Sequence, residues 1–116
     1  MEDRLEKLKK EILEFRNKRN WKQFHNPKNI ALSITIEASE LMELFQWLDM
    51  KESLEYCKKN KKEIELEVAD IFNYLLIFCN DLDIDLIKAT KNKLKISKRK
   101  YPIKKAKNNS TKYNKL

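Results

Sequence analysis

The amino-acid sequence predicts an all-α protein: a four-helix-bundle-like domain with a short extra helix and a basic C-terminal tail. The chain has 116 residues, with no glycine and only two prolines. Tight turns with positive φ usually need glycine, so its absence favours helices over a turn-rich β fold. Apolar residues also recur at three- and four-residue steps, and alternating β-branched runs are few.

The N-terminal half is expected to form two long helices. The first covers about residues 2–20, where one stripe of a helix carries four apolar side chains: Leu5, Leu8, Ile12 and Phe15. A loop rich in aromatic and amide side chains follows (NWKQFHN, 20–26). Asn26 and Pro27 then make a favourable helix start, and this second helix is expected to reach Trp47 or Leu48.

Capping signals divide the rest of the chain. Asp49 and Glu52 form a capping-box pattern that predicts a short helix near 50–59. Asn60 and Glu63 repeat the pattern and predict a third long helix to about residue 80. Residues 81–85 read as a turn into a fourth helix over 84–99. Four main helices with short links are typical of a bundle. We expect one domain over residues 1–102 and a disordered tail over 103–116, which is rich in Lys and Asn.

Charge is divided unevenly along the chain. Residues 1–87 hold 14 Lys and Arg against 18 Asp and Glu, whereas residues 88–116 hold 12 Lys and Arg and no acid. The C-terminal segment therefore suits a polyanion such as nucleic acid, an anionic membrane or nucleotide phosphates. The charged N-terminus has no secretory pattern, and the longest apolar run is too short to span a bilayer. With Cys57 and Cys79 forming no motif, a cytoplasmic protein is expected.

Two pairs of carboxylates are the main functional signal. Glu37 with Glu40, and Glu67 with Asp70, are each spaced i, i+3, which places both members on one helix face about 5–6 Å apart. Each pair lies in an apolar run without Lys or Arg, where ionised carboxylates are costly unless a cation neutralises them. Hard oxygen ligands point to Mg²⁺. The alternative is that such pairs are ordinary solvated surface.

Packing the two acidic stripes face to face would gather four or five carboxylates in one place. Repulsion among them calls for cations. Bound Mg²⁺ leaves coordination positions for phosphate oxygens, which suggests metal-assisted phosphoryl transfer. Glu43, Glu63 and Glu65 fit a solvated or helix-terminal role better than ligation, although Glu43 is also a possible base.

Aromatic side chains flank the acidic stripes. Trp21, Phe24 and His25 cluster in the loop before the second helix, where an aromatic face suits a nucleobase. Trp47 is expected on the same helical stripe as Glu40, and Tyr74 on that of Asp70. The alternatives are that Trp21 and Phe24 fill the core between helices, that His25 caps a helix, and that Tyr74 is a core residue.

These motifs together resemble the all-α nucleoside triphosphate pyrophosphohydrolases of the MazG-like superfamily, most closely the dCTP pyrophosphatase branch. The resemblance covers about residues 12–102 and rests on four segments: FRNKRNWKQFHNPKN at 15–29, EASELMELFQW at 37–47, EVADIFNYL at 67–75 and KRKYP at 98–102. The superfamily pairs ExxE with ExxD about two dozen residues later, and here 26 residues separate Glu40 from Glu67.

The resemblance implies a MazG-type fold and a role for each matching residue. It implies that Mg²⁺ is held by Glu37, Glu40, Glu67 and Asp70, with Glu40 and Glu37 as the candidate catalytic carboxylates. It implies substrate contacts from Trp21, Lys22, Gln23, Phe24, His25, Trp47 and Tyr74. The implied reaction cleaves a (deoxy)nucleoside triphosphate, dCTP or a modified dCTP first, into monophosphate and pyrophosphate, by attack of water without a covalent enzyme intermediate.

The resemblance also implies a homodimer or homotetramer, with neither a membrane nor nucleic acid as the expected partner. This chain has Ser97 and Lys100 where the branch tends to carry Asn and Arg, and Lys does not reproduce the bidentate phosphate contact of Arg. The alternative function is a non-catalytic helical module that binds nucleic acid through the basic C-terminal segment.

Overall fold

The computed structural model describes residues 3–116 and contains helices and turns but no strand among them. The all-α prediction is therefore confirmed. Two compact units are present, one up to Asp83 and one from Ile84 to Leu116, and each is described by itself. No helix among residues 3–116 is both long enough and apolar enough to cross a membrane.

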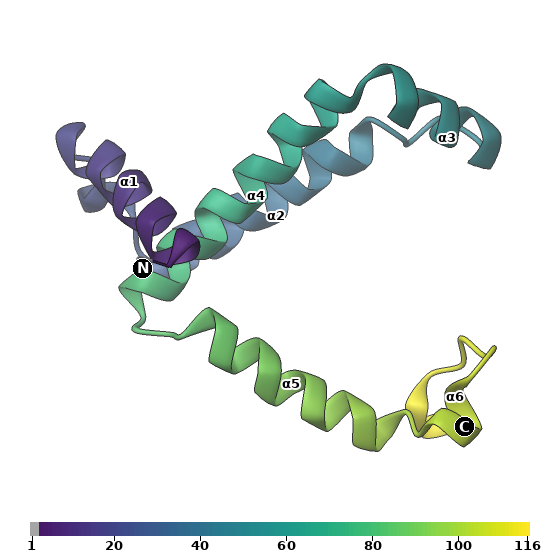
Figure 1. Ribbon diagram of the computed structural model, residues 1–116. Coiled ribbons are helices and arrows are strands. Elements are labelled where there is room, and N and C mark those ends of the chain that lie inside the picture. Colours follow the sequence, from purple (N-terminus) through teal and green to yellow (C-terminus); the bar gives the residue numbers. More distant parts are fainter. Residues whose placement is uncertain (1–2) are drawn as a thin grey trace. The chain divides into compact units, whose positions relative to one another are not determined.

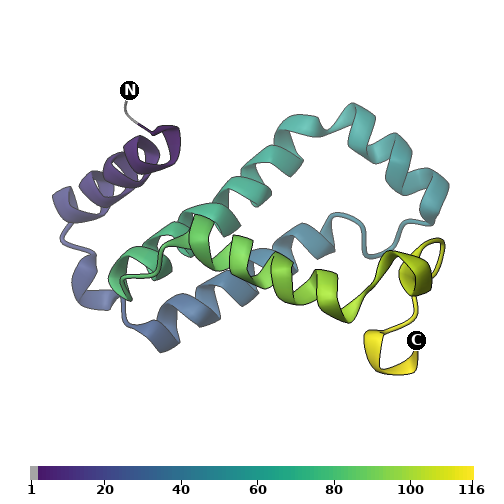
Figure 2. The same cartoon turned by 60° about the horizontal axis from the view of Figure 1, so that its bottom comes forward.

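Five elements make up the first unit: α1 (Arg4–Lys18), the 3₁₀ turn η1 (Lys22–Phe24), α2 (Pro27–Glu43), α3 (Met50–Lys59) and α4 (Lys61–Asp81). The long helices α2 and α4 lie side by side and run in opposite directions (Figure 1), and they keep this arrangement in the turned view (Figure 2). Both α1 and α3 also contact α4. The helix α4 is therefore the central element of this unit.

Side-chain caps begin several of the helices. The side chains of Asp3, Asn26 and Asp85 each accept a backbone hydrogen bond at the first turn of a helix. Asp49 and Glu52 form the complete capping box of α3, as predicted. The cap expected from Asn60 and Glu63 is wrong. The Asn60 amide donates to the carbonyl of Tyr56 at 3.2 Å, and the Glu63 carboxylate accepts from the Tyr56 hydroxyl at 2.6 Å.

The second helix ends earlier than predicted. Helix α2 stops at Glu43, four residues before Trp47, because the chain turns through backbone hydrogen bonds from Phe45 to Met42 and from Leu48 to Phe45. The Phe45 ring packs edge-on against Tyr56 of α3, with 5.7 Å between ring centroids. This contact joins the segment after α2 to α3.

The core of the first unit lies where the start of α2 meets the C-terminal half of α4. Its buried apolar side chains are Ile30, Leu76, Ile77 and Cys79. Arg16 of α1 is also buried and is only 3% exposed. Left-handed backbone occurs at Asn20, after α1, and at Asp83, after α4. These residue types tolerate positive φ better than most others, so they replace glycine at both turns.

The second unit contains α5 (Leu86–Lys100), the short helix α6 (Ile103–Ala106) and the 3₁₀ turn η2 (Tyr113–Lys115). Tyr101 and Tyr113 meet edge to face, with ring centroids 6.0 Å apart, and the Tyr101 hydroxyl accepts a hydrogen bond from the Tyr113 backbone. The residues after 102 thus form a short helix and a 3₁₀ turn. The domain boundary at 102 and the disorder of the tail without a partner stay predictions.

Candidate metal centre

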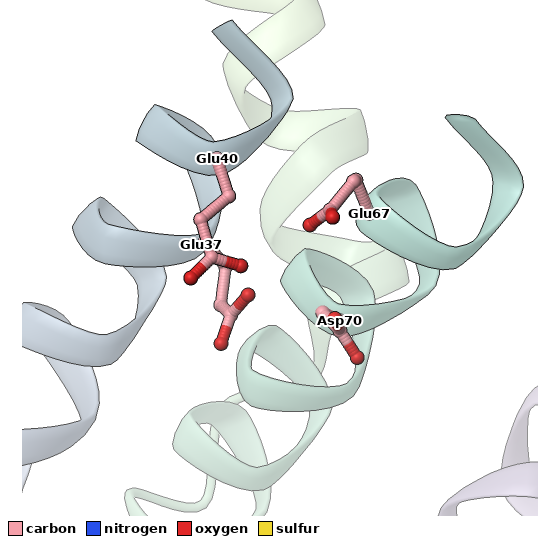
Figure 3. Close-up of side chains that lie close together, drawn as sticks. All are labelled: Glu37, Glu40, Glu67 and Asp70. Atoms are coloured by element: carbon pink, nitrogen blue, oxygen red, sulfur yellow. The ribbon is translucent and has the colours of Figure 1, made fainter. Parts of the chain in front are cut away.

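Four carboxylates from two helices converge in the first unit. Glu37 and Glu40 come from α2, and Glu67 and Asp70 come from α4. One carboxylate oxygen of each residue lies within 4.8 Å of such an oxygen of every other. The side chains point toward one another across the space between the two helices (Figure 3). The helical spacing predicted that each pair shares a helix face, and the structure shows that the two pairs face each other, so the four residues meet.

The seam between α2 and α4 explains why these polar groups are held together. Ile30 precedes Glu37 by seven residues, and Ile77 follows Asp70 by seven, which is close to two helical turns in each case. The buried apolar residues therefore lie on the same helix faces as the carboxylates. Burial of Ile30 and Ile77 fixes the two helices against each other, and this fixes the separation of the acidic pairs two turns away.

The carboxylates raise one another's affinity for protons. Partial burial is the main cause that raises the pKa of Glu37 to about 7, followed by its hydrogen bond with Glu40 and the negative charges of the other three groups. Burial also raises the pKa of Glu67, with the charge of Glu40 as the next cause. Without a cation, the fully ionised cluster is therefore unfavourable at neutral pH.

Two oxygens of the cluster have no partner within the described part of the chain. Glu37 Oε2 and Glu67 Oε2 are both buried and receive no hydrogen bond. An unsatisfied buried acceptor is costly, and a divalent cation would satisfy both of these at once. The donor set consists only of carboxylate oxygens, which suits a hard cation such as Mg²⁺. The residues present therefore fit a divalent metal.

The stability of the metal-free protein is expected to fall as pH rises. Because the pKa of Glu37 is raised from 4.5 to about 7 by folding, its contribution is fully present below about pH 4.5 and is lost as pH approaches 7. The thermal unfolding midpoint in excess chelator, measured from pH 5 to pH 8, tests this. The variant Glu37→Gln should show a smaller fall. A midpoint with the same pH dependence in both proteins would contradict the expectation.

The remaining predicted contacts lie in several places. Lys22 and His25 line a cavity at the start of α2. Trp21 packs edge-on against Phe15 at 5.7 Å and stays 44% exposed. Gln23 donates to the carbonyl of Asn20, and Phe24 is exposed. The alternative that Trp21 and Phe24 fill the core is therefore wrong, because both rings remain in contact with solvent.

Trp47 and Tyr74 differ in their relation to the acidic cluster. Tyr74 lies on α4, one turn beyond Asp70, and is half-buried. Trp47 lies beyond the end of α2 and is 86% exposed. Its predicted place on the Glu40 stripe is wrong, because the helix has already ended. Glu43 is the last residue of α2, and Glu63 is bound by Tyr56, so neither belongs to the group of four.

A buried ion pair near the cavity was not predicted. Arg16 Nη1 donates to both carboxylate oxygens of Asp81, at 3.0 and 2.8 Å, and so joins α1 to the end of α4. Burial opposes ionisation of Asp81, but hydrogen bonds from Arg16 and Asn80 outweigh it and lower its pKa. The signal for Arg16 was its position one turn after Ile12, which places a cation on the apolar stripe of α1.

Comparison with known proteins gives consistent results. The model of the MazG-like family matches residues 32–116. The chain is 33% identical to human dCTP pyrophosphatase 1 over 99% of its own length and 69% of that protein, and 31% identical to the Rattus norvegicus protein of the same name over the same shares. The crystal structure of a pyrophosphatase from Archaeoglobus fulgidus superimposes with a TM-score of 0.85 at 42% identity, covering 88% of this chain and 95% of that one.

Proposed function

This chain belongs to the MazG-like family, and from that premise we propose that it is a Mg²⁺-dependent enzyme that hydrolyses dCTP, or a modified dCTP, to the monophosphate and pyrophosphate. Its relatives show that the chain is a nucleoside triphosphate pyrophosphatase. The observation that carries the proposal of a Mg²⁺-dependent reaction is the convergence of Glu37, Glu40, Glu67 and Asp70.

The four carboxylates share one task in the proposed reaction, and two of them have a second. All four are the ligands we assign to Mg²⁺, which when bound neutralises charge on the phosphate oxygens and favours attack by water. Glu40 and Glu37 are also the groups we assign to the water: a carboxylate orients it and accepts its proton as its oxygen attacks phosphorus.

The same premise supports a set of substrate contacts. We propose that Lys22 and His25 contact the nucleotide, because both line a cavity that opens beside α2. Tyr74, one turn beyond Asp70, is well placed to contact the sugar or the base. The proposal extends to Trp21, Gln23, Phe24 and Trp47, whose exposed side chains are available to a ligand or to a second copy of the chain.

The reaction products test the proposed activity directly. Purified protein is incubated with each of the four deoxynucleoside triphosphates in the presence of Mg²⁺, and the products are separated by anion-exchange chromatography. Deoxycytidine monophosphate and pyrophosphate in equal amounts are expected from dCTP. Deoxycytidine diphosphate and phosphate would place the cleavage elsewhere, and no turnover of any nucleotide would refute the proposal. Excess chelator is expected to stop the reaction, with recovery on adding Mg²⁺.

We further propose that the chain forms a homodimer or homotetramer. Residues 3–83 leave large apolar side chains exposed on both long helices, Leu32, Ile36 and Met42 on α2 and Leu66 and Val68 on α4. Such side chains need a cover that this unit does not supply by itself. Light scattering coupled to size-exclusion chromatography is expected to give a mass of two or four times 14.0 kDa. A monomeric mass at micromolar concentration would contradict this.

A further inference from the structure

The start of α2, the turn η1 and the end of α4 enclose a cavity of about 380 Å³. Its apolar wall includes Ile30, Phe78 and Leu82, and its polar rim includes Lys22, His25 and Asn80. This volume is in the usual range for small-molecule sites, which combine apolar walls with a few polar groups. An aromatic face among apolar walls favours a flat heterocycle as the occupant.

The cavity and the acidic cluster lie along the same faces of α2 and α4. Helix positions 67, 70, 74 and 78 follow one face of α4, so the side chain of Tyr74 lies between that of Asp70 and that of Phe78. Ile30 shares a face of α2 with Glu37, seven residues further on. The near wall of the cavity, at Ile30 and Phe78, is thus about 10–12 Å along the two helices from the carboxylates, and Asn80 is about 15 Å from Asp70 along α4. A nucleotide with its phosphates at the carboxylates can extend its base toward this cavity.

Several polar groups of the cavity already have hydrogen-bond partners. Both carboxylate oxygens of Asp81 accept from Arg16, and the Asn26 side chain accepts from the backbone of Asn29. The Asn80 amide nitrogen donates to Asp81 at 3.2 Å. In this orientation the amide directs its nitrogen toward Asp81, and within residues 3–116 no hydrogen bond to its oxygen, Oδ1, is found. The nearby Nδ1 of His25 is buried and, among those same residues, without a partner.

We propose that this cavity receives the nucleobase and that Asn80 Oδ1 accepts a hydrogen bond from the 4-amino group of cytosine. The inference rests on the proposed function and adds a residue that sets base specificity. Asp81 already accepts from Arg16 through both oxygens and from Asn80 through Oδ1, so we assign the role to the Asn80 oxygen rather than to Asp81. Uracil and thymine carry an oxygen at the same position, which would face the Asn80 oxygen without a proton between them. Asn80 therefore favours dCTP over dUTP.

A substrate series tests the proposal on the unaltered protein. The values of kcat/KM are measured with Mg²⁺ for dCTP, for dUTP, and for the analogue that has only hydrogen at position 4, the triphosphate of the pyrimidin-2-one deoxynucleoside. The expected order is dCTP, then the analogue, then dUTP. Suppose that nucleotides are hydrolysed but kcat/KM for the analogue equals that for dCTP, or that kcat/KM for dUTP equals or exceeds that for the analogue. The inference is then wrong and the proposed function stands. If no nucleotide is hydrolysed, the proposed function itself fails.

The variant Asn80→Ala tests the residue. Loss of one hydrogen bond to the base is expected to lower the ratio of kcat/KM for dCTP to that for dUTP roughly tenfold. The matched control is Asn17→Ala, which removes an exposed amide from α1 and should leave the ratio unchanged. If Asn80→Ala lowers kcat/KM for dCTP and for dUTP by the same factor, the assignment is overturned. The substrate series decides the case if that variant fails to fold.

A binding measurement locates the contact independently of turnover. In NMR spectra of the ¹⁵N-labelled protein, the side-chain amide signal of Asn80 is identified by its absence from the spectrum of Asn80→Ala. Titration with deoxycytidine monophosphate and Mg²⁺ should shift this signal more than titration with deoxyuridine monophosphate. A signal that stays in place while other residues report binding of both nucleotides would show that the base lies elsewhere.

Discussion

Replacing Glu40 with Gln, or Asp70 with Asn, is expected to lower kcat/KM at least about a thousandfold. Each change removes one charged oxygen from a group of four that meets within 4.8 Å. A bound divalent ion contributes several kcal/mol to stabilising charge in the transition state, and each 1.36 kcal/mol corresponds to a factor of about ten in rate. Steady-state hydrolysis of dCTP at saturating Mg²⁺ measures the effect.

The same variants separate loss of metal from loss of fold. Removing one charge relieves repulsion in the cluster, so the metal-free variants should unfold at the same temperature as the parent protein or higher. The rise in unfolding temperature on adding Mg²⁺ should be lost. The control is Glu65→Gln, which changes an exposed carboxylate on α4 that is 3.9 Å from Lys61. Near-normal turnover by either ligand variant would refute the metal assignment.

Replacing Arg16 with Met is expected to lower the free energy of unfolding by about 3 kcal/mol. The Arg16 side chain is 4% exposed and that of Asp81 is 22% exposed, so removal of the cation leaves a partly buried carboxylate without its partner. The same change also loosens the contact of α1 with α4. Urea denaturation followed by circular dichroism measures the free energy of unfolding.

The chain contains a matched control for this ion pair. Lys18 and Glu14, on the same helix, form a pair at 3.0 Å in which both side chains are more than 60% exposed. Exposed pairs contribute little, so Lys18→Met should change the free energy of unfolding by less than about 1 kcal/mol. The double variant Arg16→Met with Asp81→Leu should recover much of the lost stability, because no buried charge remains. Equal effects of Arg16→Met and Lys18→Met would show that burial of the pair has no energetic consequence.

Local signals predicted most of the helices. The start of α2 followed from Asn26 and Pro27, and the start of α3 followed from the capping box at Asp49 and Glu52. These residues act on backbone groups within one turn, so the sequence contains both partners of each interaction. The end of α2 could not be predicted in this way. Residues 44–47 continue an apolar helical pattern, and the turn depends on packing of Phe45 against Tyr56.

The candidate site was predictable only in part, for a similar reason. The i, i+3 spacing placed each acidic pair on one helix face, and the resemblance to the MazG-like superfamily paired the two faces. Arg16 and Asp81 are 65 residues apart, and no local pattern connects them. The orientation of the Asn80 amide depends on that pair, since its donor is directed to Asp81. The hydrogen-bond acceptor that we assign to the base, Asn80 Oδ1, can therefore be identified only once the packing of α1 against α4 is known.

The left-handed positions at Asn20 and Asp83 have a consequence for the unfolded chain. A polypeptide without glycine samples fewer backbone conformations when denatured, so folding costs it less entropy at each of its reversals. This restriction suits a small unit with only a handful of fully buried apolar side chains. The low conformational entropy of the unfolded chain thus contributes to the stability of the folded protein.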